Sequence, residues 1–275
     1  MPPPRWTTPP ALRVLSWGGG QDSTTALLMS QHGELPRLDA AIFADTGYEP
    51  QAVYETLEWV TAAVTIPIYR VSAGRLGEDI LVNVSDTPHS HRPQVPFYVE
   101  GKDGRPSLLR RSCTEEYKVL PIRRKLRELL ELGPRAHIPQ GCWVEQWIGF
   151  PRDEIGRTFC SDVQWITNTF PLIIPAQMSK RDCAQWLTSH GYPIPPKSSC
   201  TFCPYHSNAY WRDMRDHRPN EWTATVEFER HLHAGKLPGV RGTPYLHKSM
   251  VPLPMAPIDV PDAQNEELFC HACNT

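Results

Sequence analysis

The stretch Ser16-Trp17-Gly18-Gly19-Gly20-Gln21-Asp22-Ser23-Thr24 follows a short apolar run at residues 12–15 and precedes a helix-forming run at residues 25–30. This order predicts a strand, a glycine loop and a helix. In such a turn, successive backbone N–H groups and the positive end of the helix dipole point at one place. The expected ligand of the loop is therefore a phosphate group.

The segments around the glycine loop predict an α/β fold. We expect strands at residues 12–16, 38–44 and 66–71, with helices at residues 22–31 and 51–65 between them. This alternation indicates a parallel, Rossmann-like sheet with helices on both faces. Ligands of such sheets bind at the carboxyl ends of the strands, which is where the glycine loop falls.

Later segments continue the same fold class. An amphipathic helix is expected at residues 121–132, a strand at 142–150 and a helix with a capping signature at 179–190. Residues 83–112 are rich in Pro, His, Arg and Gly and predict a long loop, and long loops in compact domains are often functional.

Length and charge bound the organisation and the partners. The 275 residues suit one large domain with an appended part, and we expect a flexible segment at 1–10, a nucleotide-binding domain at 11–234 and a loop-rich, partly helical region at 235–275. The net charge of −2 gives no general attraction to nucleic acid or to anionic membranes. No apolar stretch approaches the roughly 20 residues of a membrane helix, and no signal peptide is evident. We therefore expect a cytoplasmic protein without a membrane partner.

Three kinds of phosphate loop compete for this stretch. A Walker loop needs a lysine where Asp22 stands, and a dinucleotide fingerprint needs a third glycine where Ser23 stands. The third kind has the core Ser-Gly-Gly-x-Asp-Ser, and residues 19–23 match it with Gly18 in place of the first serine. On these residues the chain resembles the adenine nucleotide α-hydrolases, also called PP-loop ATP pyrophosphatases.

Four further segments extend the resemblance, in order, to the phosphoadenosine-phosphosulfate (PAPS) reductase-like branch of that superfamily. The resemblance covers about residues 12–230 and implies a HUP-type nucleotide-binding fold. The segments are Asp45-Thr46-Gly47 after the second strand, Arg111 to Pro121 with Cys113 and Lys118, Trp147 to Arg157 with Arg152, and Cys200-Thr201-Phe202-Cys203-Pro204.

The intact loop implies ATP as the substrate, because true PAPS reductases have lost this pattern and end in a Glu-Cys-Gly-type tail that this chain lacks. The resemblance implies an enzyme that binds ATP with Mg²⁺, cleaves it between the α- and β-phosphates and adenylates an acceptor, with sulfur transfer as one candidate use. The implied catalytic residues are Asp22, Ser23, Arg152 and Lys118. The implied nucleotide contacts are Ser16, Gly18, Gly19, Gly20, Gln21, Asp22, Ser23, Thr24, Asp45, Thr46, Gly47, Arg111 and Arg157.

Cys200 and Cys203, with Cys113 as a third thiol, are the candidate metal ligands. Thiolates at this spacing suit a [4Fe–4S] cluster or Zn²⁺, while free thiols are the remaining alternative. The fourth ligand is not assigned. A second pair, Cys270 and Cys273, could join a zinc site or act as a redox tail.

Two other functions stay open. The chain could be a sulfonucleotide reductase, or a nucleotide-binding accessory subunit of a phage, mobile-element or CRISPR-associated defence system that acts on nucleic acid. The sequence does not identify the acceptor of the adenylation; a nucleic acid and a sulfur donor protein are the candidates, and a homodimer is one expected assembly. Aromatic residues at 210–222 could stack on bases, although packing in a core is the favoured interpretation.

Overall fold

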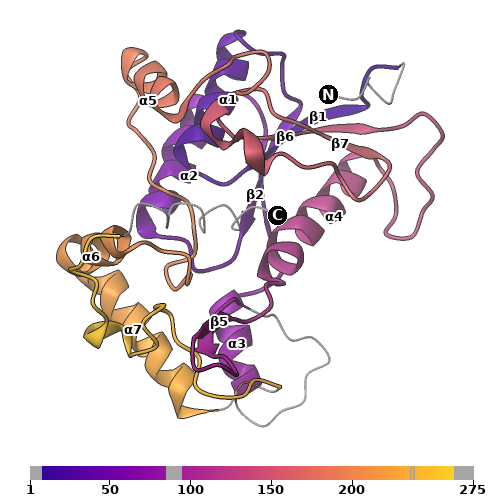
Figure 1. Cartoon of the computed structure of the whole chain (residues 1–275). Helices are drawn as coiled ribbons and strands as arrows, with labels where there is room; N and C mark the ends of the chain where they lie inside the picture. Colours follow the sequence, from indigo (N-terminus) through magenta and orange to yellow (C-terminus); the bar gives the residue numbers. More distant parts are fainter. Residues whose placement is uncertain (1–7, 85–94, 236, 238, 263–275) are drawn as a thin grey trace. The chain divides into compact units, whose positions relative to one another are not determined.

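The computed structural model describes residues 8–84, 95–235, 237 and 239–262 (Figure 1). The chain forms two compact units, which are described separately. The sheet unit contains Met1–Asp45, Gln51–Val71 and Val119–Ser198, and the helical unit contains Thr46–Pro50, Ser72–Lys118 and Ser199–Thr275. The predicted pair Cys270 and Cys273, and most of the segment predicted to be flexible at 1–10, lie outside the described residues.

The sheet unit is built on five strands in the order β3-β2-β1-β6-β7. Strand β1 runs parallel to both β2 and β6, and β6 runs parallel to β7. The predicted parallel, Rossmann-like sheet is thus confirmed, with one further strand that the sequence pattern did not reveal, β7. The strands are β1 Leu12–Trp17, β2 Ala40–Asp45, β3 Ile68–Ser72, β6 Val144–Ile148 and β7 Ile166–Thr169.

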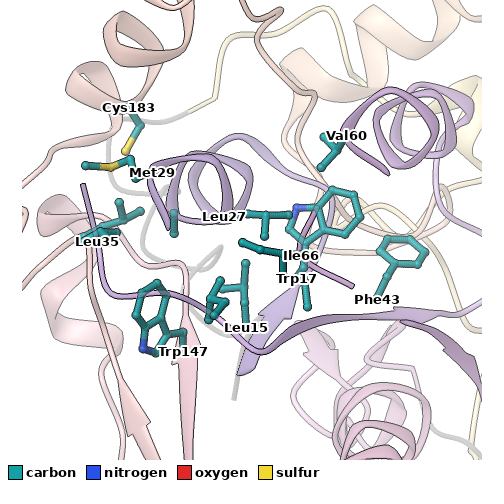
Figure 2. Close-up of a cluster of buried hydrophobic side chains, with 14 of the residues drawn as sticks. Leu15, Trp17, Leu27, Met29, Leu35, Phe43, Val60, Ile66, Trp147 and Cys183 are labelled. Carbon is teal, nitrogen blue, oxygen red and sulfur yellow. The ribbon is translucent and has the colours of Figure 1, made fainter. Parts of the chain in front are cut away.

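Helices cover both faces of this sheet, as expected, because neighbouring side chains of a strand point to opposite faces. Figure 2 shows the first face, where Leu15, Trp17 and Phe43 of the strands gather with Leu27 and Val60 of the helices. The strand side chains that alternate with these point to the second face of the sheet, where they pack against a later helix. The first face carries α1 Gln21–His32, α2 Gln51–Ala63 and α5 Lys180–Ser189, and the second carries α4 Leu120–Leu129.

Local signals fix where these helices begin and end. Helix α1 ends at Gly33, which takes the left-handed conformation with φ of 80°. Helix α5 begins after Ser179, whose hydroxyl accepts the backbone N–H of Asp182 while the Asp182 carboxylate accepts the N–H of Ser179. The predicted helix at 121–132 ends earlier, at Leu129, and Glu131 has a φ of 56° that cannot continue a helix.

The helical unit corrects the prediction of an uninterrupted loop at residues 83–112, since the strands β4 and β5 form an antiparallel pair there. Trp211 is fully buried in the core of this unit, so it packs inside the unit rather than offering a surface for a base. The elements are α3 Leu76–Val84, β4 Tyr98–Glu100, β5 Pro106–Leu108, α6 Asn208–His217 and α7 Pro219–Ala234; short helical turns lie at Glu115–Val119, at Leu253–Met255 and, in the sheet unit, at Arg152–Arg157.

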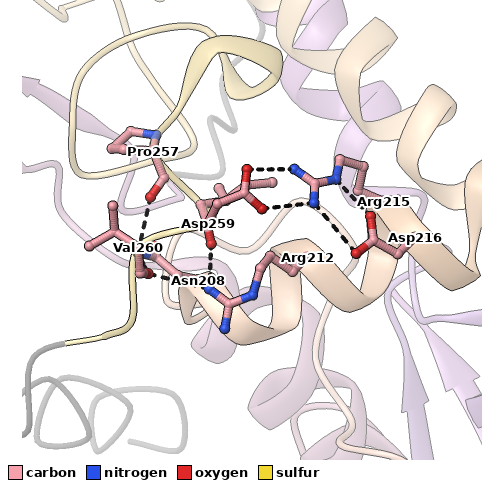
Figure 3. A network of polar contacts seen from close by, with 8 residues as sticks. Asn208, Arg212, Arg215, Asp216, Pro257, Asp259 and Val260 are labelled. Atoms are coloured by element: carbon pink, nitrogen blue, oxygen red, sulfur yellow. Dashed lines mark hydrogen bonds and ion pairs between the residues drawn. The ribbon is translucent and has the colours of Figure 1, made fainter.

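The described residues between 239 and 262 have little regular secondary structure, but polar contacts tie them to helix α6 (Figure 3). Asn208 donates from Nδ2 to the carbonyl oxygen of Val260 at 2.9 Å. Arg215 forms a two-point ion pair with Asp259, at 2.8 and 3.0 Å. These contacts attach a loop-rich segment, with its short helical turn at Leu253–Met255, to helix α6.

Candidate nucleotide site and thiol cluster

The glycine loop lies where the order of the sheet strands reverses. From β1, the chain places β2 and β3 on one side and β6 and β7 on the other. In open α/β sheets, ligands bind outside the carboxyl ends of the strands at such a switch point. Strand β1 ends at Trp17, so Gly18, Gly19 and Gly20 occupy this position and lead directly into α1.

The start of α1 has the features of a phosphate cradle. Gly20 is the N-cap and no side chain caps the helix, so the first-turn N–H groups are left for a ligand. Gly19 has a φ of 73°, and a Cβ there would lie 2.9 Å from the Cγ1 of Val53. A side chain at Gly19 would therefore be strained and would push into helix α2. The residues present fit a bound phosphate chain.

A second close approach brings the segment after β6 to the same place. A Cβ on Gly149 would lie 2.5 Å from the Cα and 2.8 Å from the backbone nitrogen of Ser23. Only glycine allows these two backbones to approach so closely. Gly149 belongs to a motif that the sequence analysis quoted, but no role was assigned to it; the signal was a glycine directly after a strand.

Charged side chains surround Asp22. The pKa of Asp22 is raised to about 6, mainly by burial and less by Glu154, while Lys180, the hydrogen bond from Gln21 and Arg157 partly offset this rise. Gln21 also donates to the backbone carbonyl of Lys180 at 2.6 Å, which ties the start of α1 to the start of α5. Arg157 and Lys180 are thus both near enough to Asp22 to lower its pKa. The sequence analysis did not name Lys180, because it lies far from Asp22 in the chain.

Other predicted residues of the sheet unit already have partners within the protein. Thr24 is fully buried and its Oγ1 accepts the indole N–H of Trp17 at 3.0 Å. The hydroxyl of Ser16 accepts from Nε2 of Gln146 on β6 at 2.8 Å. These two bonds stabilise the strand and helix that carry the loop, and each hydroxyl, being the acceptor in its bond, keeps its own proton to donate.

The arginines of the 152–157 turn differ from each other. The Arg157 side chain is 8% exposed, pairs with Glu154 at 2.5 Å and lies over the ring of Phe150 at 4.4 Å. The Arg152 side chain is exposed, and its backbone N–H donates to the carbonyl of Met178 at 2.7 Å. Arg157 is therefore fixed in place, whereas Arg152 has a side chain that can reach toward solvent or a ligand.

Asp45 ends strand β2 and is neutralised by neighbours in the sheet unit. The Arg70 guanidinium donates from Nε to Oδ2 at 2.9 Å, and Tyr54 donates to Oδ1 at 2.9 Å. The sequence analysis missed Arg70, because its pairing follows from adjacent strands rather than from any motif. With both oxygens bonded, Asp45 anchors the strand end.

In the helical unit, three predicted residues meet around one glutamate. Thr46 donates from Oγ1 to Oε1 of Glu49 at 3.2 Å, and Lys118 Nζ lies 3.5 Å from the same oxygen. The sulfur of Cys200 lies 3.2 Å from Thr46 Oγ1. Since the single hydroxyl proton of Thr46 is given to Glu49, the Cys200 thiol is the donor to Thr46. The Oε2 of Glu49 is buried and has no hydrogen-bond partner among the described residues.

Gly47 and Arg111, two further predicted nucleotide contacts, pack against other residues of the helical unit. Gly47 has a φ of 76°, and a Cβ there would lie 3.1 Å from the Cγ of Arg75. The predicted nucleotide contact Arg111 donates from Nη2 to Thr114 Oγ1 at 2.5 Å and lies over the ring of Tyr205 at 5.9 Å. Arg111 is thus held by its own unit.

The three cysteines predicted to bind a metal all lie in the helical unit. Within residues 8–84, 95–235, 237 and 239–262, no group of three or more His, Cys, Asp or Glu side chains could hold a metal ion. Burial raises the pKa of the Cys200 thiol to about 12, and Glu49 adds to this. Cys113 and Cys203 are partly buried free thiols. An iron–sulfur cluster, a zinc site and free thiols therefore stay alternative predictions for these cysteines.

Among the helices described, none is both long and apolar enough to cross a membrane. No protein-family model matches the sequence, and no curated protein matches it.

Solved structures resemble this chain distantly. The phosphoadenylyl-sulfate (PAPS) reductase from Candida auris, in a phosphate complex, is 14% identical over 69% of this chain and 76% of its own, with a TM-score of 0.39. The U34-tRNA thiolase NcsA from Methanococcus maripaludis, with its [4Fe–4S] cluster, is 15% identical over 84% of this chain and 74% of its own, with a TM-score of 0.33. The first carries the name of the reductases that the motifs resemble. At these TM-scores, no ligand or reaction is transferred from either.

Proposed function

We propose that the sheet unit binds ATP and that the protein cleaves it at the α-phosphate, as a PAPS reductase-like member of the adenine nucleotide α-hydrolase superfamily. One observation supports this most directly. Three consecutive glycines lead from the end of β1 into the uncapped start of α1, at the place where the strand order reverses. The sequence motifs that follow the loop support the choice of superfamily.

The proposed reaction is an adenylation. A nucleophilic oxygen of the acceptor forms a bond to the α-phosphorus of ATP, and the bond from that phosphorus to the oxygen bridging to the β-phosphate breaks. Pyrophosphate leaves with the bonding electron pair, the acceptor keeps the adenylyl group, and its proton passes to solvent. Most of the catalytic effect in such a transfer comes from positioning and charge neutralisation.

This chain's residues have distinct roles in the proposal. The N–H groups at the start of α1 and the Ser23 hydroxyl would hold the phosphate tail, and Lys180 and Arg157 would supply positive charge beside Asp22. Mg²⁺, held by the Asp22 carboxylate, would neutralise the phosphates. Lys180 and Arg157 lower the pKa of Asp22 against the larger effect of burial. The resulting pKa of about 6 lies below neutral pH, so most of the carboxylate is ionised there.

The test uses the full-length protein with ATP, Mg²⁺ and candidate acceptors, including tRNA and single-stranded DNA. Pyrophosphate and AMP or an adenylated acceptor are expected, and Asp22→Asn should remove this turnover while Asp162→Asn, an exposed ion-pair partner elsewhere in the unit, should not. ADP and phosphate as the products, or no binding of ATP, would overturn the proposal.

Two other results would favour the alternative functions. Release of sulfite from PAPS with a thiol donor, lost when Cys270 and Cys273 are replaced, would indicate a sulfonucleotide reductase. Tight ATP binding without turnover, together with a co-purifying partner, would indicate a nucleotide-binding subunit.

A further inference from the structure

The hydroxyl of Ser198 lies against the glycine loop. A Cβ built on Gly18 would be 3.0 Å from Ser198 Oγ, and one built on Gly20 would be 2.9 Å from the same atom. The backbone carbonyl of Pro196 is also near, at 3.5 Å from the Cβ position of Gly20. Residues 196–198 thus line the same place as the first and third glycines, although they are far from them in sequence.

Ser198 is able to take a ligand at this position. In the part of the chain that the structure describes, its hydroxyl makes no hydrogen bond, and its side chain is only partly buried. A serine hydroxyl can donate one hydrogen bond, and a donor to a charged phosphate oxygen forms a stronger bond than one to a neutral acceptor. Of the two polar atoms found beside the glycines, the carbonyl of Pro196 can only accept, whereas Ser198 Oγ can donate.

We propose that Ser198 is a positioning residue that donates a hydrogen bond to the phosphate tail of the nucleotide held by the glycine loop. It supplies, from the 196–198 segment, the hydroxyl that the loop lacks at Gly18. This inference rests on the proposed function of the sheet unit. The geometry allows a hydroxyl at position 198 to take the place of one at position 18, because Ser198 Oγ lies next to the point where a side chain at position 18 would begin.

The experiment measures the dissociation constants of ATP and AMP by calorimetry, with the full-length wild type, Ser198→Ala and the control Ser189→Ala. Ser189 lies at the end of α5 and bonds to the carbonyl of Trp186. We expect Ser198→Ala to weaken ATP binding about tenfold or more, the range for a hydrogen bond to a charged group, and to leave AMP binding unchanged. The control should change neither affinity.

A double variant tests the exchange itself. Gly18 has no positive φ, and only Ser198 lies within 4 Å of a Cβ added there, so Gly18→Ser fits once residue 198 is shortened. Gly18→Ser with Ser198→Ala should restore ATP affinity to within about threefold of the wild type, and its melting temperature reports on folding.

The outcomes separate the two proposals. If the wild type does not bind ATP, the proposed function fails and this inference fails with it. If the wild type binds ATP but Ser198→Ala keeps the wild-type ratio of ATP to AMP affinity, or the double variant restores nothing, only the role of Ser198 is overturned.

Discussion

Replacing Asp22 by asparagine should make the protein more stable at neutral pH while removing its proposed activity. The folded protein raises the pKa of Asp22 from 3.8 to about 6, mainly by burial. The ionised carboxylate is therefore less favourable in the folded chain than in the unfolded one. The difference corresponds to about 3 kcal/mol once the group is ionised in both states. Asparagine has nearly the same shape and carries no charge.

The sign of the pH dependence follows from this shift. Because the folded-state pKa is the higher one, the unfolded chain releases its proton first as pH rises. The contribution of Asp22 to stability is fully present below 3.8 and is lost as pH rises through about 6. About 2 kcal/mol of this loss falls between about pH 4.5 and about pH 8. The advantage of Asp22→Asn should grow by that amount over the same range.

The measurement is urea unfolding, followed by tryptophan fluorescence at several pH values, with the wild type, Asp22→Asn and Asp162→Asn. The pKa of Asp162 is lowered by its hydrogen bond from Arg123, so this control should lose rather than gain stability above about pH 4. An Asp22→Asn variant that is no more stable than the wild type at about pH 8, or whose advantage does not change with pH, would falsify the reasoning. A buried carboxylate that lowers the stability of the folded protein, as Asp22 does at neutral pH, is typical of functional sites.

Three further outcomes are expected. Gly149→Ala should destabilise the sheet unit by about 3 kcal/mol, because the new Cβ would lie 2.5 Å from the Cα of Ser23 in helix α1. The control Gly156→Ala, whose Cβ would have nothing within 4 Å, should change the unfolding free energy by less than about 1 kcal/mol. Lys118→Met should cost on the order of 1–3 kcal/mol, because a buried carboxylate loses its cation, and equal stability in thermal melts would contradict this. Iodoacetamide at about pH 8 should modify the exposed Cys160 well before Cys200, since at a pKa of about 12 only about one Cys200 thiol in ten thousand is ionised. Mass spectrometry showing early labelling of Cys200 would count against its protonated state.

The sequence pattern predicted most of the sheet unit, because its elements depend on local signals. Strand β1, the glycine loop and helix α1 follow from apolar runs and glycines, and the helix after Ser179 follows from its capping box. These patterns act over a few residues, so they can be recognised without knowledge of the fold. The helical unit was less visible, because β4 and β5 are only three residues long.

The candidate site divides in the same way. By itself, the sequence determined the glycine loop, since the backbone conformation at Gly19 and the uncapped start of α1 follow from consecutive residues. Only the tertiary structure placed Ser198 over that loop and set Lys180 beside Asp22. The physical reason is that such contacts join residues far apart in the chain. Their positions depend on how the strands and helices pack, and this packing cannot be predicted from the sequence pattern of a short segment.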